Sequence, residues 1–271
     1  MSRVQLTSLD KLLFPKAGFT KADLIDYYRT VAHALIPHIA GRPMTLGRFP
    51  NGVEERGFAQ TECRGAPEWM HTHEIELRSG ERRRYCLLDG EDALVWAANL
   101  GTIELHPYPW RASRAELPDA LLLDLDPGDG AGLRECCEVA LLAREELNRP
   151  AAVKTSGGGG LHIAAPLERE HTFEETKRLA RDLAEQLAQR HPRLVTAGSQ
   201  RAARAGRVLI DWAQNDARRS TVAPYSLRAA DYPLVSTPIT WDEVAGDPDA
   251  LWFEARVVLE RVERLGDLYG S

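Results

Sequence analysis

Short apolar runs closed by turn residues alternate along this chain with longer segments of helical periodicity. The most distinctive run is LLLDLDPG at residues 121–128, which predicts a buried strand that ends at a Pro-Gly turn. Because side chains alternate along a strand, Asp124 and Asp126 should point to one face while Leu123 and Leu125 point to the other. The pattern therefore predicts two carboxylates on one face at the end of a core strand.

The same pattern predicts elements along the rest of the chain. Thr20, with Asp23 three residues on, is typical of the N-cap of a helix that ends in the region of Pro37 and Gly41. Further helices are expected at 91–100, 133–147, 173–190 and in part of 242–265, strands at 44–49, 102–106, 151–155, 161–165 and 208–211, a hairpin at 73–77 and 85–88, and an irregular segment at 58–68. Strands and helices interleave without a strict repeat, which indicates an α+β or mixed fold class.

Carboxylates placed on one face repel each other and are costly to desolvate, and a bound cation would relieve both effects. Mg²⁺ and Mn²⁺ prefer such oxygen ligands. The alternative is that the aspartates cap the following helix. A second apolar strand, at 208–211, delivers Asp211 at its end. Three strand-borne carboxylates are what a two-metal phosphoryl-transfer site needs, so the combination favours a metal site over helix caps.

Four consecutive glycines, 157–160, lie between the strands expected at 151–155 and 161–165. Such a run is usually a flexible linker, but its β-rich flanks favour the tip of a hairpin. Glycines let backbone N–H groups approach an anion closely and form a nest for phosphate. Ser156 adds a hydroxyl and His162 an imidazole that can donate to a phosphate oxygen.

Composition narrows the class of protein. The 271 residues are 44% hydrophobic and 27% charged, which suits one large or two small domains with a real core. No apolar run approaches about 18 residues and the N-terminus lacks a signal-peptide pattern, so a cytoplasmic protein with no membrane partner is expected. The four cysteines form no Cys-x-x-Cys pair, which predicts buried or inert thiols rather than a zinc knuckle or a disulfide framework.

The net charge of −6 argues against a surface coated with basic groups, although the distribution of charge matters more than its sum. Basic residues cluster near the N-terminus, at 82–84, at 201–207 and at 218–219. Each cluster is either a solvated face or a phosphate site.

The motifs taken in order resemble the archaeo-eukaryotic primase superfamily and, within it, the polymerase domain of bacterial ligase D. The resemblance covers nearly the whole chain and rests on these stretches: DKLLFP at 10–15, IAGRP at 39–43, FPNG at 49–52, IELH at 103–106, LDLDPG at 123–128, KTSGG at 154–158, GLH at 160–162, DWAQN at 211–215 and VAPYSLR at 222–228. It implies a primase-like α+β fold with mixed sheets flanked by helices around a central active-site cleft. Residues 1–271 would form a single catalytic domain, or two intertwined subdomains that share the cleft.

The resemblance also implies a function. The chain would be a template-dependent nucleotidyltransferase that uses two Mn²⁺ or Mg²⁺ ions and nucleoside triphosphates, with a preference for ribonucleotides. It would fill short gaps or broken ends during DNA repair such as non-homologous end joining. The expected partners are DNA with gaps or overhangs and a 5′-phosphate, a separate ligase and a Ku-like end-binding protein, and the expected location is the bacterial nucleoid. Because no ligase or nuclease motif is present, a stand-alone polymerase is expected.

Roles carry over residue by residue. The resemblance implies metal binding and catalysis by Asp124, Asp126 and Asp211, and nucleotide binding by His106, Ser156, Gly157, His162, Arg204, Gln214 and Arg228. It implies 5′-phosphate binding by Lys11, Lys21 and Arg48, with surface charge as the alternative for the lysines, and template stacking by Phe58. Two rival functions are a primase that starts chains de novo and a non-catalytic binder of 5′-phosphorylated ends. The three aspartates argue against the second rival.

Two positions depart from the family pattern. Gly159 stands where ligase D polymerases commonly have a lysine, so Gly159→Lys is expected to tighten nucleotide binding by adding a cation. Phe58 is followed by Ala59 where the family often has paired phenylalanines, which predicts a weaker grip on the template base.

Overall fold

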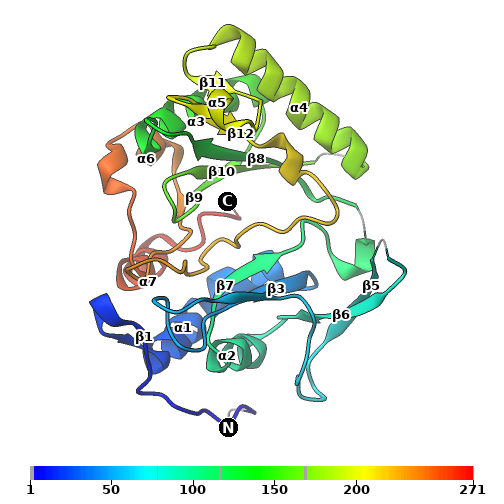
Figure 1. Ribbon diagram of the computed structural model, residues 1–271, viewed down its shortest axis with the longest axis vertical. Helices are drawn as coiled ribbons and strands as arrows, with labels where there is room; N and C mark the ends of the chain where they lie inside the picture. Colours follow the sequence, from blue (N-terminus) through cyan, green and yellow to red (C-terminus); the bar gives the residue numbers. More distant parts are fainter. Residues whose placement is uncertain (1–2, 78, 116, 168–169, 271) are drawn as a thin grey trace. The chain divides into compact units, whose positions relative to one another are not determined.

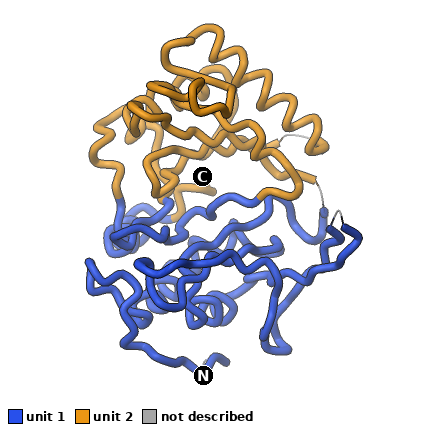
Figure 2. The backbone as a smooth tube through the Cα atoms, viewed as in Figure 1, with its two compact units in different colours: residues 1–115, 220–236, 253–266 blue, residues 116–219, 237–252, 267–271 orange. Residues whose placement is uncertain are grey.

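The chain folds into two compact units, each assembled from three separated stretches of sequence (Figure 2). The structure, a computed structural model, describes residues 3–77, 79–115, 117–167 and 170–270. Unit 1 comprises residues 1–115, 220–236 and 253–266, and unit 2 comprises residues 116–219, 237–252 and 267–271. A single catalytic domain over 1–271, and a cleft shared by subdomains, stay predictions.

Unit 1 is built on a five-stranded sheet of order β4-β3-β6-β5, with β7 pairing β3 (Figure 1). Its strands are β3 (Pro43–Arg48), β4 (Phe58–Gln60), β5 (Thr72–Glu76), β6 (Arg82–Leu87) and β7 (Thr102–Pro107), and a separate two-stranded sheet pairs β1 (Leu12–Phe14) with β2 (Phe19–Thr20). Its helices are α1 (Lys21–Ile39), α2 (Glu91–Asn99) and α7 (Ala255–Leu265), with 3₁₀ turns η1 (Pro15–Ala17) and η2 (Ala112–Arg114). Helix α1 packs against both α2 and α7.

The start of α1 confirms the predicted cap. The backbone N–H of Asp23 donates to the Thr20 hydroxyl at 3.3 Å, and that of Thr20 donates to the Asp23 carboxylate at 2.7 Å. The helix passes through Pro37 and ends at Ile39, within the predicted end region between Pro37 and Gly41. Pro37 lies in the last turn, where it removes one intrahelical hydrogen bond and leaves few further turns to disrupt.

Unit 2 is built on a six-stranded sheet of order β11-β12-β8-β10-β9-β13. Its strands are β8 (Ala120–Pro127), β9 (Ala152–Thr155), β10 (Leu161–Pro166), β11 (Val195–Thr196), β12 (Val208–Ile210) and β13 (Pro238–Ile239). Its helices are α3 (Leu133–Leu147), α4 (Phe173–Arg190), α5 (Arg201–Arg204) and α6 (Trp241–Val244), with 3₁₀ turns η3 (Trp212–Gln214) and η4 (Pro248–Ala250). Helices α3 and α4 contact each other and β8, and Figure 1 shows α4 lying over the sheet.

Strand β8 is the core strand that the sequence predicts. Leu121, Leu123 and Leu125 are at most 4% exposed, and the residues between them are only partly buried. Asp124 and Asp126, which are two residues apart, therefore lie on the same, less buried face of the strand. This face of β8 therefore carries two carboxylates close together.

Two expectations about residues 58–88 are wrong. Residues 58–60 are not irregular but form β4, which pairs with β3. Cys63 and Cys86 form a disulfide, although they lie 23 positions apart, because the chain around Cys63 returns to β6, where the Cys63 N–H donates to the Arg84 carbonyl at 2.7 Å. Cys136 and Cys137 are buried free thiols as expected, and burial raises the pKa of Cys137 to about 11.

Within the described part of the chain, no helix is both long and apolar enough to cross a membrane.

Candidate active site

Unit 2 brings the three predicted aspartates onto neighbouring strands. Strand β12 pairs antiparallel with β8, so that Leu209 lies opposite Asp126 and Ile210 opposite Leu125. Asp211 follows directly, and its N–H donates to the Asp124 carbonyl at 2.8 Å. Since residues opposite each other in a sheet point to the same face, all three carboxylates are carried by one face of the β8–β12 pair.

Burial and neighbouring charges both act on the carboxylate of Asp126. Burial, and then the neighbouring charge of Asp124, raise the pKa of Asp126 to about 6, with Asp211 adding to the effect and the Arg204 guanidinium opposing it. Ionised Asp126 is therefore under electrostatic stress in the protein without a cation. A divalent ion would relieve that stress.

We expect Asp126→Asn to stabilise the metal-free fold by about 1–3 kcal/mol at neutral pH. The folded-state pKa of Asp126 lies above its unfolded value, so ionisation costs stability as pH rises. The advantage of the variant should be absent below about pH 4 and complete above about pH 7. Denaturant unfolding in EDTA across this range measures it, with Asp129→Asn as control because Asp129 is an exposed carboxylate on the same turn. If the variant is no more stable than wild type at pH 8, ionised Asp126 does not destabilise the metal-free fold.

Asp211 is engaged with its own neighbours. Its carboxylate accepts from the Ala213 N–H at 3.1 Å and from the Gln214 amide at 3.3 Å, and Arg219 lies 3.5 Å away. Among the described residues, no group of three or more His, Cys, Asp or Glu side chains is arranged to hold a metal ion. The donor set nevertheless fits Mg²⁺ or Mn²⁺ in ligand type and charge, and a bound cation would offset the burial and the repulsion that raise the pKa of Asp126.

Arg204 lies beside this cluster, at the end of α5. Gly128 allows the approach, because a β-carbon there would collide with the Arg204 carbonyl. Within the described ranges, the buried Nε of Arg204 has no hydrogen-bond partner. A pocket of about 320 Å³ opens here, lined by Pro127, Gly128, Asp129, Ser199, Arg201 and Arg204. An anionic ligand in this pocket would satisfy the unpaired Arg204 donor.

The glycine run is the hairpin tip between β9 and β10, as predicted. The Ser156 hydroxyl accepts from the N–H groups of Gly158 at 3.1 Å and Gly160 at 3.0 Å. Gly157 has φ +71°, and a β-carbon at Gly160 would collide with the Leu125 carbonyl, so both positions need glycine. Two amides of the expected phosphate nest are thus already held by Ser156, which fixes the shape of the tip.

His162 faces Asp124 across the β10–β8 ladder. The two residues are paired in register, and the Nε2 atom of His162 lies 3.2 Å from an Asp124 carboxylate oxygen. Its other ring nitrogen, Nδ1, lies 3.0 Å from the ammonium of Lys154. The structure therefore places His162 beside the aspartate cluster and sets Lys154, which was not among the predicted site residues, on its other side.

Unit 1 holds a second polar cluster, centred on Glu104. The Nε2 atom of His106 lies 2.9 Å from the Glu104 carboxylate, which also accepts from the Ala229 N–H at 2.9 Å and lies 3.4 Å from Nε of Arg228. Burial opposes the ionisation of Glu104, but the His106 hydrogen bond and the Arg228 charge outweigh it and lower its pKa. Two predicted nucleotide-binding residues are thus joined through an acid that the sequence reading missed.

Lys11 and Lys21 lie together at the β1–β2 pair. The Lys21 N–H donates to the Lys11 carbonyl at 2.8 Å, the Lys11 ammonium donates to Asn51 at 2.7 Å, and the Lys21 ammonium donates to Thr7 at 3.2 Å. Lys21 is only 7% exposed, and burial, followed by the charge of Lys11, lowers its pKa. A nearby anion would relieve this repulsion.

Arg48 was predicted to bind the 5′-phosphate together with the two lysines, but its described contacts are with other residues of unit 1. It donates to the Leu100 carbonyl at 2.8 Å and to the Gln60 side chain at 2.7 Å, and its guanidinium lies 5.3 Å from the centre of the Phe58 ring. Phe58 is 50% exposed and lines a pocket of about 300 Å³ that also contains Glu104 and His106. Arg48 therefore orients the predicted template-stacking ring.

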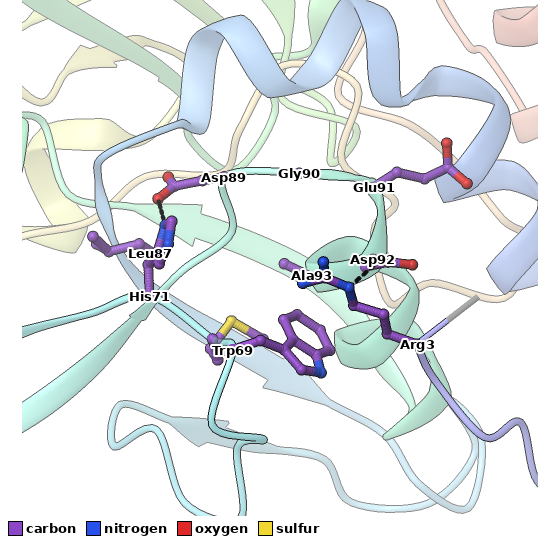
Figure 3. Close-up of a pocket in the computed structure, with 10 residues that line it drawn as sticks. Arg3, Trp69, His71, Leu87, Asp89, Gly90, Glu91, Asp92 and Ala93 are labelled. Atoms are coloured by element: carbon purple, nitrogen blue, oxygen red, sulfur yellow. Dashed lines mark hydrogen bonds and ion pairs between the residues drawn. The ribbon is translucent and has the colours of Figure 1, made fainter. Parts of the chain in front are cut away.

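Another hollow of unit 1, of about 470 Å³, does not suit nucleic acid (Figure 3). Its lining includes Asp89, Glu91 and Asp92 against the single cation of Arg3, which lies 3.9 Å from Asp92. Carboxylates in this excess repel phosphate. We therefore leave this hollow out of the candidate site.

The sequence matches a known family over most of its length: the model of the LigD primase-polymerase domain matches residues 20–269. The chain belongs to this family. The multifunctional non-homologous end joining protein LigD of Mycolicibacterium smegmatis is 40% identical over 272 residues, which cover 98% of this chain and 35% of that protein. The bifunctional non-homologous end joining protein LigD of Bacillus subtilis is 27% identical over 272 residues, which cover 97% of this chain and 43% of that protein.

Solved structures agree with the family. The polymerase domain of ligase D from Mycobacterium tuberculosis, in complex with DNA, matches with a TM-score of 0.94 at 37% identity, covering 99% of this chain and 97% of that one. The predicted resemblance and the primase-like α+β fold are confirmed. The roles of single residues stay predictions. So do the stand-alone form and the location, because the chain spans only about a third of the M. smegmatis relative.

The backbone of this LigD-family domain changes the expectation for Gly159. Its φ of +96° strains any L side chain, and a β-carbon there would lie 4.0 Å from the Trp252 ring. We now expect Gly159→Lys to destabilise the fold by about 1–2 kcal/mol and to leave the nucleotide KM unchanged or raised. Gly159→Ala is the matched control, since it carries the same strain without the charge. A KM below that of the alanine variant, rising with salt, would contradict this expectation.

Proposed function

We propose that this chain is a template-dependent nucleotidyltransferase that fills short gaps and broken ends in DNA repair by end joining, with a preference for ribonucleotides. The observation that carries the proposal is the placement of Asp124, Asp126 and Asp211 on one face of two paired strands, in a chain of the LigD primase-polymerase family. The ribonucleotide preference rests on the family resemblance alone.

In this proposal Asp124, Asp126 and Asp211 would hold two Mg²⁺ or Mn²⁺ ions. The chemistry that such ions supply is activation of the primer hydroxyl and stabilisation of the leaving pyrophosphate. The electrostatic stress on Asp126 supports cation binding, because a charged ligand would offset both the burial and the repulsion that raise its pKa.

The remaining residues bind and orient. Arg204 offers its unpaired donor to a phosphate oxygen, and His162 places an imidazole beside Asp124. Ser156 fixes the glycine hairpin, and Gly157 adopts a positive φ there that favours glycine. Gln214 orients the Asp211 carboxylate through its amide. In unit 1, His106 and Arg228 are proposed nucleotide contacts that Glu104 holds in place.

We propose DNA with a 5′-phosphate at a gap, overhang or break as the nucleic-acid substrate, bound through Lys11 and Lys21. The similar polymerase domain from M. tuberculosis is described in complex with DNA. A ligase activity and a Ku-like end-binding protein are proposed partners, because the relatives are non-homologous end joining proteins that extend well beyond the region matched here.

Primer extension on gapped DNA tests the proposal. The protein is offered a primer, a template and a 5′-phosphorylated downstream strand, with ribo- or deoxyribonucleotides and with Mn²⁺, Mg²⁺ or EDTA. We expect metal-dependent, template-directed addition that is faster with ribonucleotides. No addition under any metal and sugar would overturn the proposal and favour a non-catalytic end binder, while products formed without a primer would favour a de novo primase.

A further inference from the structure

Strand β9 buries a lysine that none of the assigned roles uses. Lys154 is 2% exposed and lies on the fifth strand of the six-stranded sheet, between β10 and the edge strand β13. Lysine is almost never buried to this extent unless its ammonium is paired, because removing the charge from water is costly. The buried ammonium therefore needs a polar partner inside the unit, and Nδ1 of His162 lies 3.0 Å from it.

The register of the sheet places three polar side chains in one row. His162 on β10 lies opposite Asp124 on β8 and, on its other side, opposite Lys154 on β9. Residues that are paired in an antiparallel ladder point to the same face, so the row Asp124, His162, Lys154 runs straight across three strands. The distances agree: 3.2 Å from Asp124 to His162 Nε2, and 3.0 Å from His162 Nδ1 to the Lys154 Nζ.

The chemistry of the row determines where the imidazole proton lies. An ammonium has three donors and no acceptor, so the ring nitrogen that faces it must accept. Nδ1 of His162 faces Lys154, which leaves the proton on Nε2, the ring nitrogen that lies 3.2 Å from the Asp124 carboxylate. An arrangement with the proton on Nδ1 would set an N–H against the ammonium and a lone pair against a carboxylate, which repels at both ends.

We propose that Lys154 is a positioning residue that fixes His162 in its Nε2–H tautomer, so that the imidazole presents a donor on the face of the sheet that carries the aspartates. In the nucleotide-free protein Nε2 lies 3.2 Å from the Asp124 carboxylate. The kinetic meaning of the inference rests on the proposed function: with a nucleotide present, the same N–H is aimed at an anionic oxygen of the triphosphate.

The tautomer is measured directly on the wild-type protein, without nucleotide, metal or DNA. Long-range ¹H–¹⁵N NMR of histidine-labelled protein distinguishes a protonated Nε2 from a protonated Nδ1, and the His162 signal is assigned by its loss in His162→Gln. We expect the Nε2–H form at mildly alkaline pH. An Nδ1–H form, or an even mixture of the two, would overturn the inference whether or not any variant folds.

Variants then test the role of the lysine. Lys154→Met keeps the length of the side chain and removes the donors, and we expect a mixture of tautomers and a loss in kcat/KM of about tenfold or more, chiefly through nucleotide KM. Lys154→Arg keeps the charge and donors and should restore the Nε2–H signal in part. The matched control is Lys177→Met, which removes a lysine of the same unit that pairs with Asp216 at 2.9 Å. A pure Nε2–H signal in Lys154→Met would also overturn the inference.

The two proposals fail separately. A wild-type protein that shows the Nε2–H tautomer but extends no primer would leave the role of Lys154 standing and overturn the polymerase function. An active polymerase whose His162 is in the Nδ1–H form would support the proposed function and overturn the role of Lys154.

Discussion

Single replacement of Asp124, Asp126 or Asp211 by alanine is expected to reduce nucleotide addition by about three orders of magnitude or more. Each substitution removes one carboxylate from a cluster that lies on two hydrogen-bonded strands, and with it a ligand for the ions that would carry the developing charge. The loss should appear in kcat of primer extension with either Mn²⁺ or Mg²⁺. Excess metal should not restore it.

The control for this series is Asp182→Ala. Asp182 is an exposed carboxylate on α4 that does not line the pocket beside Arg204, so its loss should leave extension near the wild-type rate. Each variant must also remain folded, which is expected because the buried leucines of β8 are untouched. Near-normal extension by any of the three aspartate variants in a metal-dependent assay would show that the aspartate concerned does not have the proposed catalytic role.

Binding to gapped DNA is expected to depend on the phosphate at the downstream 5′ end. Lys11 and Lys21 lie side by side, and the pKa of Lys21 is lowered by burial and by the charge of Lys11. A phosphate monoester carries nearly two negative charges and would offset that repulsion while accepting charge-assisted hydrogen bonds. We expect DNA with a 5′-phosphate to bind about ten- to a hundredfold more tightly than the same DNA with a 5′-hydroxyl.

The double variant Lys11→Ala, Lys21→Met should erase this preference while leaving extension of a simple recessed primer largely intact. Methionine replaces Lys21 because the side chain is buried and its volume must be kept. Lys16→Ala is the matched control: it removes an exposed lysine between the two in sequence, one that pairs with Asp231. If the wild type binds DNA with a 5′-phosphate and DNA with a 5′-hydroxyl equally tightly in a titration, the two lysines do not recognise the 5′-phosphate.

The sequence by itself determined the parts of this protein that depend on local order. The alternation in 121–128 placed Asp124 and Asp126 on one face of a core strand, and the structure has them there. The Thr20 cap, the hairpin at 73–88 and the alternation that sets Glu104 and His106 apart from Ile103 and Leu105 follow from the same short-range rules. The ordered motifs then identified the family, because many short matches in one order are far more specific than any one of them.

Only the tertiary structure decided which of these residues meet. Lys154 is eight positions from His162 in the chain, and the register of β9 against β10 is what sets its ammonium against the imidazole. The same holds for Glu104 with Arg228, for Cys63 with Cys86, and for Arg48, whose contacts are with Phe58 and Gln60. Local propensity says which face a side chain takes, but long-range pairing fixes its neighbours, and charge and pKa depend on those neighbours.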